Sequence, residues 1–206
     1  MKKSAADLRG RDSYRLLVDT IVPRPVAWVT TVSPEGIPNL APFSFFNGVS
    51  SRPPIVSLAI ASKPKVGATG EREFVAKDTT RNIVKSGQYI IHLAPAHLGS
   101  MVSRTAEDHP RETDVPALLG LETVPGDWVD VPRIVSLPIA MECRMETIVE
   151  VGEPSTHLLL GEVLGWHVDD ALLDDEGRVW AARWDPLTRL GVDGFRDPSE
   201  PEEREP

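Results

Sequence analysis

Residues 24–57 read RPVAWVTTVSPEGIPNLAPFSFFNGVSSRPPIVS, and this stretch decides the fold. Two apolar runs, 26–32 and 38–47, are joined by a Pro-Glu-Gly turn at 34–36, which is typical of an antiparallel hairpin. The second run mixes Asn, Ser, Ala and Pro with phenylalanines, which an ordinary core strand does not need. Flat apolar groups beside neutral polar ones suit a flat ring with polar edges. An edge strand that faces water gives the same pattern.

The composition is that of a globular protein. The chain has 206 residues, 41% hydrophobic and 26% charged, which suits one domain with a sizeable core. We expect this domain to span residues 1–196 and the acidic segment 197–206 to be a disordered tail. The net charge of -9 argues against nucleic acid or an anionic membrane as a partner.

The single cysteine, Cys143, excludes an intrachain disulfide and a cysteine-rich metal site. We expect its side chain to be inert packing. The sequence shows neither an apolar signal region nor a run long enough to span a membrane, so we expect a cytoplasmic protein.

Strong periodicity marks residues 139–151, where apolar residues alternate with charged ones, as in a long strand with one wet face. The chain turns at 152–155, and we expect 158–168 to run back beside that strand. Shorter strands are predicted over 26–32, 38–47, 55–60 and 89–93.

Helices are predicted over 4–20, 78–86 and 96–103. Asp78 is the expected N-cap of the second helix, and Gly87 is its expected C′ residue. Residues 62–77 and 104–114 are polar or charged without a period, so both are predicted loops. The second of these is expected to be mobile and could act as a lid.

These elements predict a mainly β protein, an antiparallel barrel with short helical insertions. The alternative is a doubly wound sheet, which needs long crossover connections between successive strands. The short connection at 33–37 excludes such a crossover between the first two strands.

The sequence lacks the glycine-rich nucleotide fingerprints and the HExxH zinc motif, and its five histidines are scattered. We therefore expect no metal site. If the protein performs demanding chemistry, an organic cofactor supplies it.

Three segments could hold such a cofactor. The first is 39–47, and the second is 77–82, where a helix begins. Free N–H groups at a helix start, with Lys77 and Thr79, suit a phosphate, although a simple helix cap is the alternative. The third is His157, whose charge is tunable near neutral pH, although a structural histidine is the alternative.

The ordered set of motifs resembles the flavin reductase-like family, which has the FMN-binding split-barrel fold. The similar pieces run in order from about residue 14 to about residue 195. They are 24–31 (RPVAWVTT), Gly36, 39–46 (NLAPFSFF), Pro53-Pro54, Lys77-Asp78-Thr79 with Asn82, and His157 with 161–163 (GEV).

The resemblance implies a Greek-key split β-barrel and a homodimer with FMN near the subunit interface. It implies that the flavin ring and ribityl chain lie along Asn39, Ala41, Pro42, Ser44, Phe45 and Asn47, with Arg24 and Thr30 on the paired strand. It implies a phosphate near Ser62, Lys77, Thr79 and Asn82. It also implies His157 near the flavin and nicotinamide, and Phe195 at the flavin edge.

The implied activity is that of an NAD(P)H:flavin oxidoreductase, which could supply reduced flavin to a partner monooxygenase. The same groove suits an FMN-binding electron-transfer or sensor protein with little NAD(P)H activity. A barrel without flavin, used as an interaction module, is the third possibility. Hydride transfer needs orientation and close approach more than a protein acid or base, in agreement with the missing acid–base motifs.

Overall fold

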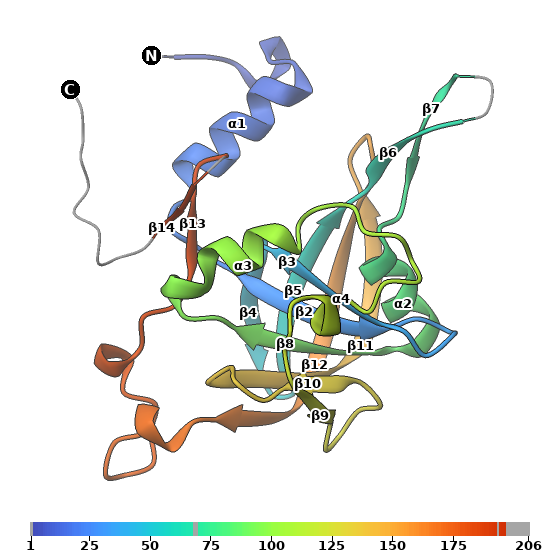
Figure 1. The fold of residues 1–206 in the computed structure, drawn as a ribbon. Coiled ribbons are helices and arrows are strands. Elements are labelled where there is room, and N and C mark those ends of the chain that lie inside the picture. Colours follow the sequence, from blue (N-terminus) through green and yellow to red (C-terminus); the bar gives the residue numbers. More distant parts are fainter. Residues whose placement is uncertain (1, 68–69, 193, 197–206) are drawn as a thin grey trace.

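The computed structural model describes residues 2–67, 70–192 and 194–196 (Figure 1). A strongly curved sheet of seven antiparallel strands dominates it, in the order β3-β2-β8-β11-β12-β5-β4. The predicted mainly β, antiparallel architecture is therefore confirmed. Its strands are β2 (Ala27–Val32), β3 (Pro38–Phe43), β4 (Phe46–Ser51), β5 (Pro54–Ala61), β8 (Gln88–Leu93), β11 (Ile139–Val151) and β12 (Thr156–Val168).

The predicted long hairpin is confirmed as β11 and β12, which pair along 13 residues each. Along the first half of β12, buried residues alternate with half-buried ones, and the buried set points into the barrel. Gly161 belongs to this buried set. A Cβ there would lie 1.9 Å from the hydroxyl oxygen of Tyr89, so the close approach of the Tyr89 side chain to β12 requires a glycine.

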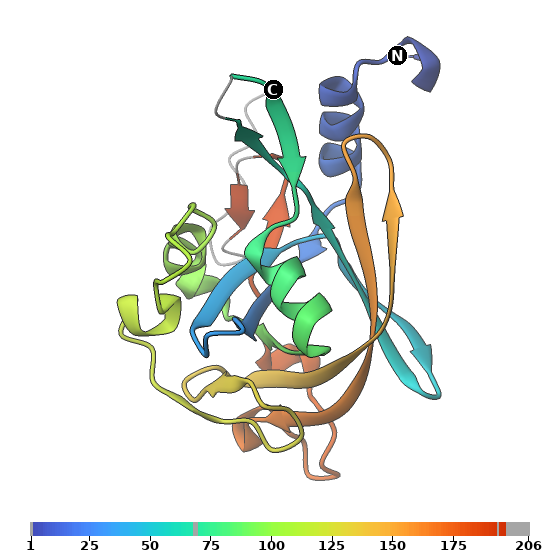
Figure 2. The same cartoon turned by 90° about the vertical axis from the view of Figure 1, so that its right-hand side faces the viewer.

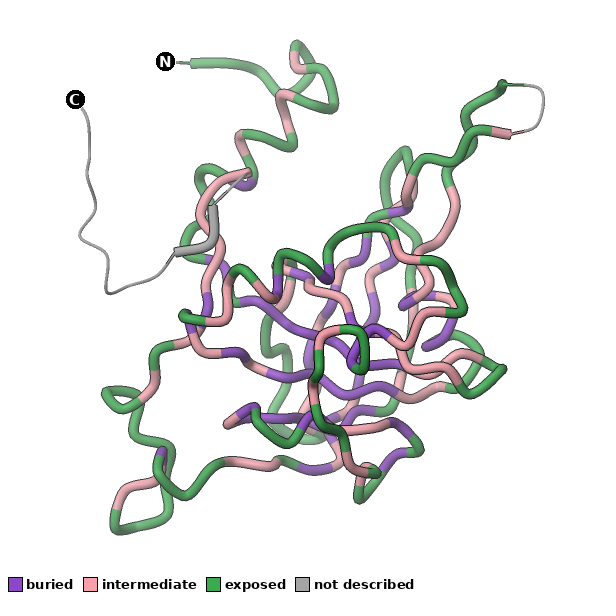
Figure 3. The backbone as a smooth tube through the Cα atoms, viewed as in Figure 1, coloured by how far each residue is buried: buried purple, intermediate pink, exposed green. Residues whose placement is uncertain are grey.

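Strand β2 has a core on each face, which explains its nearly continuous apolar sequence. Ala27 and Val29 point into the barrel, whereas Trp28 packs into a second cluster with Leu40, Val102 and other residues on the outer face. The indole nitrogen of Trp28 donates a hydrogen bond to Thr105 Oγ1 at 2.8 Å. Figure 3 shows the buried residues gathered where the strands cross.

Helix α2 (Asp78–Ser86) is confirmed, and its Ile83 enters the barrel core. Gly87 ends the helix in the left-handed region at φ 72°, as predicted. The expectation that Asp78 is the N-cap was wrong. Lys77 occupies that position without a side-chain cap, and Asp78 is the first helical residue, where its carboxylate pairs with Arg81 and Arg111.

One loop prediction and one strand prediction were wrong. Residues 62–77 form a hairpin of β6 (Lys63–Val66) and β7 (Arg72–Val75) and not a loop. Its strands pair mainly with each other and extend beyond the barrel (Figures 1 and 2), so they need no apolar pattern. The predicted strand 38–47 ends at Phe43, because the chain bends at 44–45 to let β4 pair with β5.

The remaining elements surround the barrel. The predicted helix 4–20 is a short 3-10 turn, Ala5–Asp7, followed by α1 (Gly10–Thr20), and 96–103 becomes a 3-10 turn followed by α3 (Gly99–Arg104). Among the described residues, no helix combines the length and apolar character that a membrane crossing needs. The elements that the sequence did not predict are β1 (Arg24–Pro25), α4 (Val115–Leu118), β9 (Thr123–Pro125), β10 (Pro132–Ile134), 3-10 turns at Asp170–Leu172 and Ala181–Arg183, β13 (Thr188–Leu190) and β14 (Gly194–Arg196).

Candidate functional site

A groove of about 140 Å³ lies between β3, the start of α2 and the segment that follows α3. Its walls are residues 39 and 41–43 of β3, residues 77–79, and residues 105–109, with Lys63 and Arg189 completing them. The structure therefore brings together five of the predicted cofactor residues. These are Asn39, Ala41, Pro42, Lys77 and Thr79.

Two side-chain hydrogen bonds fix the start of α2 against the first hairpin. Asn39 Nδ2 donates to Thr79 Oγ1 at 3.1 Å, and Asn82 Nδ2 donates to Thr31 Oγ1 at 3.0 Å. Asn82 is buried by this bond and lies next to the groove without lining it. The Thr79 oxygen accepts a hydrogen bond from Asn39, so the hydroxyl hydrogen of Thr79 can still donate to a third group, such as a bound anion.

Three cationic side chains line the groove: Lys63 at the start of β6, Lys77 before α2, and Arg189 on β13. Lys77 Nζ lies 5.7 Å from the centroid of the Phe43 ring. Burial lowers the pKa of Lys77, and the charges of Lys63 and Arg189 add to this effect, while Asp108 opposes it. Three carboxylates, of Asp78, Glu107 and Asp108, also line the groove, so an anionic group of a ligand would compete with them for these cations.

Sequence reasoning missed Lys63 and Arg189. Arg189 reaches the groove because β13 pairs with β1, so Arg189 lies opposite Arg24 in that ladder. It also donates from Nη2 to the carbonyl of Val192 at 2.7 Å. A contact between positions so far apart in the chain leaves no local signal that a single sequence could show.

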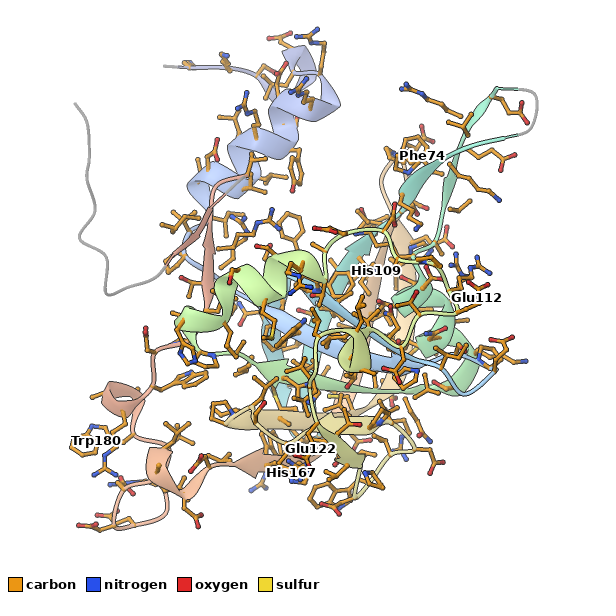
Figure 4. The ribbon with its side chains drawn as sticks, in the orientation of Figure 1. Phe74, His109, Glu112, Glu122, His167 and Trp180 are labelled. Carbon is orange, nitrogen blue, oxygen red and sulfur yellow. The ribbon has the colours of Figure 1, made fainter. Side chains whose placement is uncertain are left out.

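One of the three carboxylates of the groove pairs directly with one of its cations. Lys63 Nζ donates to Asp108 Oδ1 at 2.5 Å, and this hydrogen bond lowers the pKa of Asp108. Residues 105–109 thus line one side of the groove, and Figure 4 labels His109 and Glu112 on this part of the chain.

Arg24, Ser44 and Phe45 form a separate cluster beside α1. The buried guanidinium of Arg24 donates to the carbonyls of Val18, Ile21 and Gly191 and to Ser44 Oγ. The Phe45 ring centroid lies 5.9 Å from the Arg24 guanidinium carbon. In this chain Arg24 therefore ties the end of α1 to the turn after β13, and its donors serve the fold.

Two other predicted residues, Thr30 and Asn47, do not line the groove. Thr30 is fully buried, and its hydroxyl lies 3.5 Å from the carbonyl of Ile90. Asn47 is exposed on β4 and accepts from the backbone N–H of Gly48. Phe195 pairs with Arg189 through the backbone, but its side chain lies outside the described residues.

His157 and Ser62 lie at one end of the β5–β12 pair. Ser62 Oγ is 3.2 Å from Ser155 Oγ. His157 is buried on the inner face of β12, and its Nε2 lies 3.6 Å from Glu150 Oε1. Among the described residues, its Nδ1 has no hydrogen-bond partner, so the imidazole retains unused capacity for a ligand or a water molecule.

Two further buried polar residues serve the fold. His92 donates from Nδ1 to the carbonyl of Trp28 and accepts at Nε2 from the N–H of Ile134. Burial lowers the pKa of His92 to about 3, so the ring is neutral. His97 and His109 lie outside the barrel core.

Glu142 holds the connection between β9 and β10. Its carboxylate, 0% exposed, accepts from the N–H groups of residues 127, 128 and 129 and from His167 Nε2 at 2.7 Å. Burial alone would raise the pKa of Glu142, but these donors outweigh it and lower the pKa. Asp127 and His167 place ligand-type atoms within 4.8 Å of this carboxylate, yet its lone pairs are already used by protein donors.

The groove thus offers three cations, three carboxylates, hydrogen-bond donors and the apolar side chains of residues 41–43, a set that suits a flat ligand with an anionic group. Three other proteins are similar to this chain in sequence or in structure. An uncharacterised protein of Deinococcus radiodurans is 39% identical over 88% of this chain and 78% of its own length. Component B of nitrilotriacetate monooxygenase from Bacillus cereus is 30% identical, with a TM-score of 0.86 over 99% of this chain and 98% of that one. A Shewanella frigidimarina protein with a split barrel domain, 16% identical, gives a TM-score of 0.77 over 100% of this chain and 98% of that one.

These neighbours confirm the split-barrel fold. The family model described as "Flavin reductase like domain" matches residues 19–184, a range that contains β2 to β12 and most of the groove. The match supports a flavin-related redox function. The chain belongs to the flavin reductase-like family.

Proposed function

We propose that the protein is an FMN-binding NAD(P)H:flavin oxidoreductase and that the groove beside β3 is its FMN site. The observation that carries this proposal is that Lys63, Lys77 and Arg189 line one groove together with Ala41, Pro42 and Phe43 of β3, in a chain of this family. Cations beside apolar side chains match a ligand that has both a phosphate and a ring system.

The residues present fit the two parts of FMN. Lys63, Lys77 and Arg189 would hold the phosphate, and Thr79 would donate a hydrogen bond to it. Asn39, Ala41 and Pro42 would lie along the ring system, where an amide meets heteroatoms and small apolar groups allow close approach. His157 does not line the groove, and it is the candidate for orienting the nicotinamide because of its place in the family pattern.

When bound, FMN supplies the redox chemistry by accepting a hydride from NAD(P)H. The task of the protein is then to orient the two ring systems and exclude water. This division explains why the groove is built from binding groups. We propose that the reduced flavin serves a partner oxygenase, because the Bacillus cereus neighbour is described as one component of a monooxygenase.

We also propose a cytoplasmic homodimer. Tyr14 and Leu17 of α1, Ile21 just after it, and Val49 of edge strand β4 are exposed apolar side chains. The Phe45 ring is 6.4 Å from that of Tyr14, so the two surfaces adjoin. A second copy that covers them would bury this apolar surface.

The proposal is tested with the purified protein, FMN and NADH or NADPH in the absence of oxygen. We expect a yellow complex whose absorbance near 450 nm bleaches on a catalytic timescale, about 1 per second or faster. A yellow complex that neither nucleotide bleaches would overturn the reductase activity and favour an electron carrier or sensor. A protein that stays colourless with added FMN would overturn the flavin site itself.

A further inference from the structure

We propose that residues 105–111, here called the acidic strap, gate the groove, and that Asp108 is an internal competitor for the phosphate of the ligand. This inference rests on the proposed FMN site and adds a basis for choosing phosphorylated flavins over riboflavin. It is carried by three features of the strap: its anchors, the spaces it borders and the exposure of its ion pairs.

The strap is fixed at its base and held by ion pairs further along. At its base, Thr105 is buried, accepts from Trp28 Nε1 and donates to the carbonyl of Val102 at 2.7 Å. Further along, Asp108 binds Lys63, and Arg111 Nε lies 3.2 Å from Asp78 Oδ1. The buried base at Thr105 therefore serves as the hinge of the strap. The two ion pairs, Asp108 with Lys63 and Arg111 with Asp78, hold the strap in place and are here called the latches.

The strap borders three spaces. The groove on the β3 side holds about 140 Å³, and a hollow between the strap and residues 33–39 holds about 170 Å³. A third space, of about 860 Å³, is lined by the β6–β7 hairpin, the start of α2 and the strap, and it shares Lys63, Asp78, Asp108 and His109 with the groove. Sites for drug-sized ligands usually hold about 300–1,000 Å³, so the groove alone is too small for a flavin. A flavin that extends from the larger space into the groove would have to displace the ion pair of Lys63 and Asp108, which borders both.

The latches are weak enough to open. The side chain of Asp108 is 80% exposed and that of Arg111 is 66% exposed, and exposed ion pairs contribute little to stability. A phosphate carries about 1.5–2 negative charges at neutral pH, whereas a carboxylate carries one. The phosphate of FMN can therefore replace Asp108 as the partner of Lys63, and this new ion pair offsets the loss of the old one. Riboflavin has no phosphate, so it must displace the strap without gaining an ion pair.

The test compares Asp108→Asn with Glu112→Gln, an isosteric change of the same charge on an exposed residue of the same segment that lines none of the three spaces. Binding of FMN and of riboflavin is measured by flavin fluorescence at low salt. We expect Asp108→Asn to bind FMN about two- to fivefold more tightly, riboflavin to gain less, and Glu112→Gln to match the wild type. Equal FMN affinity in Asp108→Asn and wild type would overturn the inference, as would an equal gain for riboflavin or for Glu112→Gln.

A second measurement separates this inference from the proposed function. Inorganic phosphate alone is added to the wild type, and amide hydrogen exchange is followed across residues 105–111. We expect faster exchange in the strap, because phosphate releases Asp108 from Lys63, and no such response in Asp108→Asn. Unchanged exchange in the wild type would overturn the strap mechanism. Failure of FMN to bind any variant would instead overturn the FMN site.

Discussion

Replacing Lys77 with alanine should weaken FMN binding far more than riboflavin binding. Lys77 is half-buried beside the Phe43 ring, and burial lowers its pKa, so its charge is incompletely solvated in the free protein. At about 4 Å and an effective dielectric constant near 20, a lysine attracts one unit of phosphate charge by about 4 kcal/mol. After desolvation, a hydrogen bond to a charged group contributes about 1.5–3 kcal/mol.

That free energy corresponds to FMN binding that is about 10- to 150-fold weaker. Riboflavin lacks the phosphate, so its affinity should change by about twofold or less. The assay is a fluorescence titration with both flavins at one ionic strength. The matched control is Lys85→Ala, which removes the same charge from the exposed last turn of α2. If FMN and riboflavin lose equal affinity, or if Lys85→Ala reproduces the effect, Lys77 does not hold the phosphate.

The same lysine predicts a pH dependence. Burial lowers the pKa of Lys77 in the free protein, and a bound phosphate would raise it. FMN affinity should therefore be complete below the free-protein pKa and fall as the pH rises through it, earlier than for an ordinary lysine. Titrations at increasing pH should show this fall for wild type but not for Lys77→Ala. A fall that persists in Lys77→Ala belongs to another group.

Three further changes have defined outcomes. Glu142→Gln should cost about 2–4 kcal/mol in urea unfolding at neutral pH, because an amide cannot accept from all four donors. Folding lowers the pKa of Glu142, so the wild type should be more stable than Glu142→Gln at pH values above the pKa of Glu142 in the unfolded chain. This difference in the free energy of unfolding should vanish as the pH falls through the pKa of the folded state, and a difference that does not change with pH would contradict the reasoning. Gly161→Ala should cost about 1–3 kcal/mol, and Tyr89→Phe should recover part of it by removing the hydroxyl that the new Cβ would meet; strict additivity would refute the contact. His157→Ala should slow reduction by NAD(P)H more than it weakens FMN, and a loss of flavin alone would make the role structural.

The sequence predicted those strands of the central sheet whose residue pattern identifies them without knowledge of their partners. Apolar and charged residues alternate along much of 139–151, although the predicted wet face is wrong for residues 139–143, which are all buried. Strand β2 is largely apolar because both of its faces are covered. The hairpin at 63–75 was missed because its strands are largely exposed and bury little. The bend at 44–45 was missed because only closure of the sheet, through pairing of β4 with β5, requires it.

The candidate site was predicted in part for the same physical reason. Asn39 and Thr79 belong to local motifs, and the structure brings them into contact. Lys63, Asp108 and Arg189 come from three distant segments that meet only in the folded chain. Arg24 carries a recognisable motif, but its partners on α1 and in the turn after β13 show that it serves the fold.

A crystal structure of the protein with FMN would test the proposed site most directly. We predict that the phosphate lies within hydrogen-bond distance of Lys77 and Thr79, that the ring system follows β3, and that Asp108 no longer contacts Lys63. A flavin bound elsewhere, or one whose phosphate lies away from Lys63 and Lys77, would contradict the proposal.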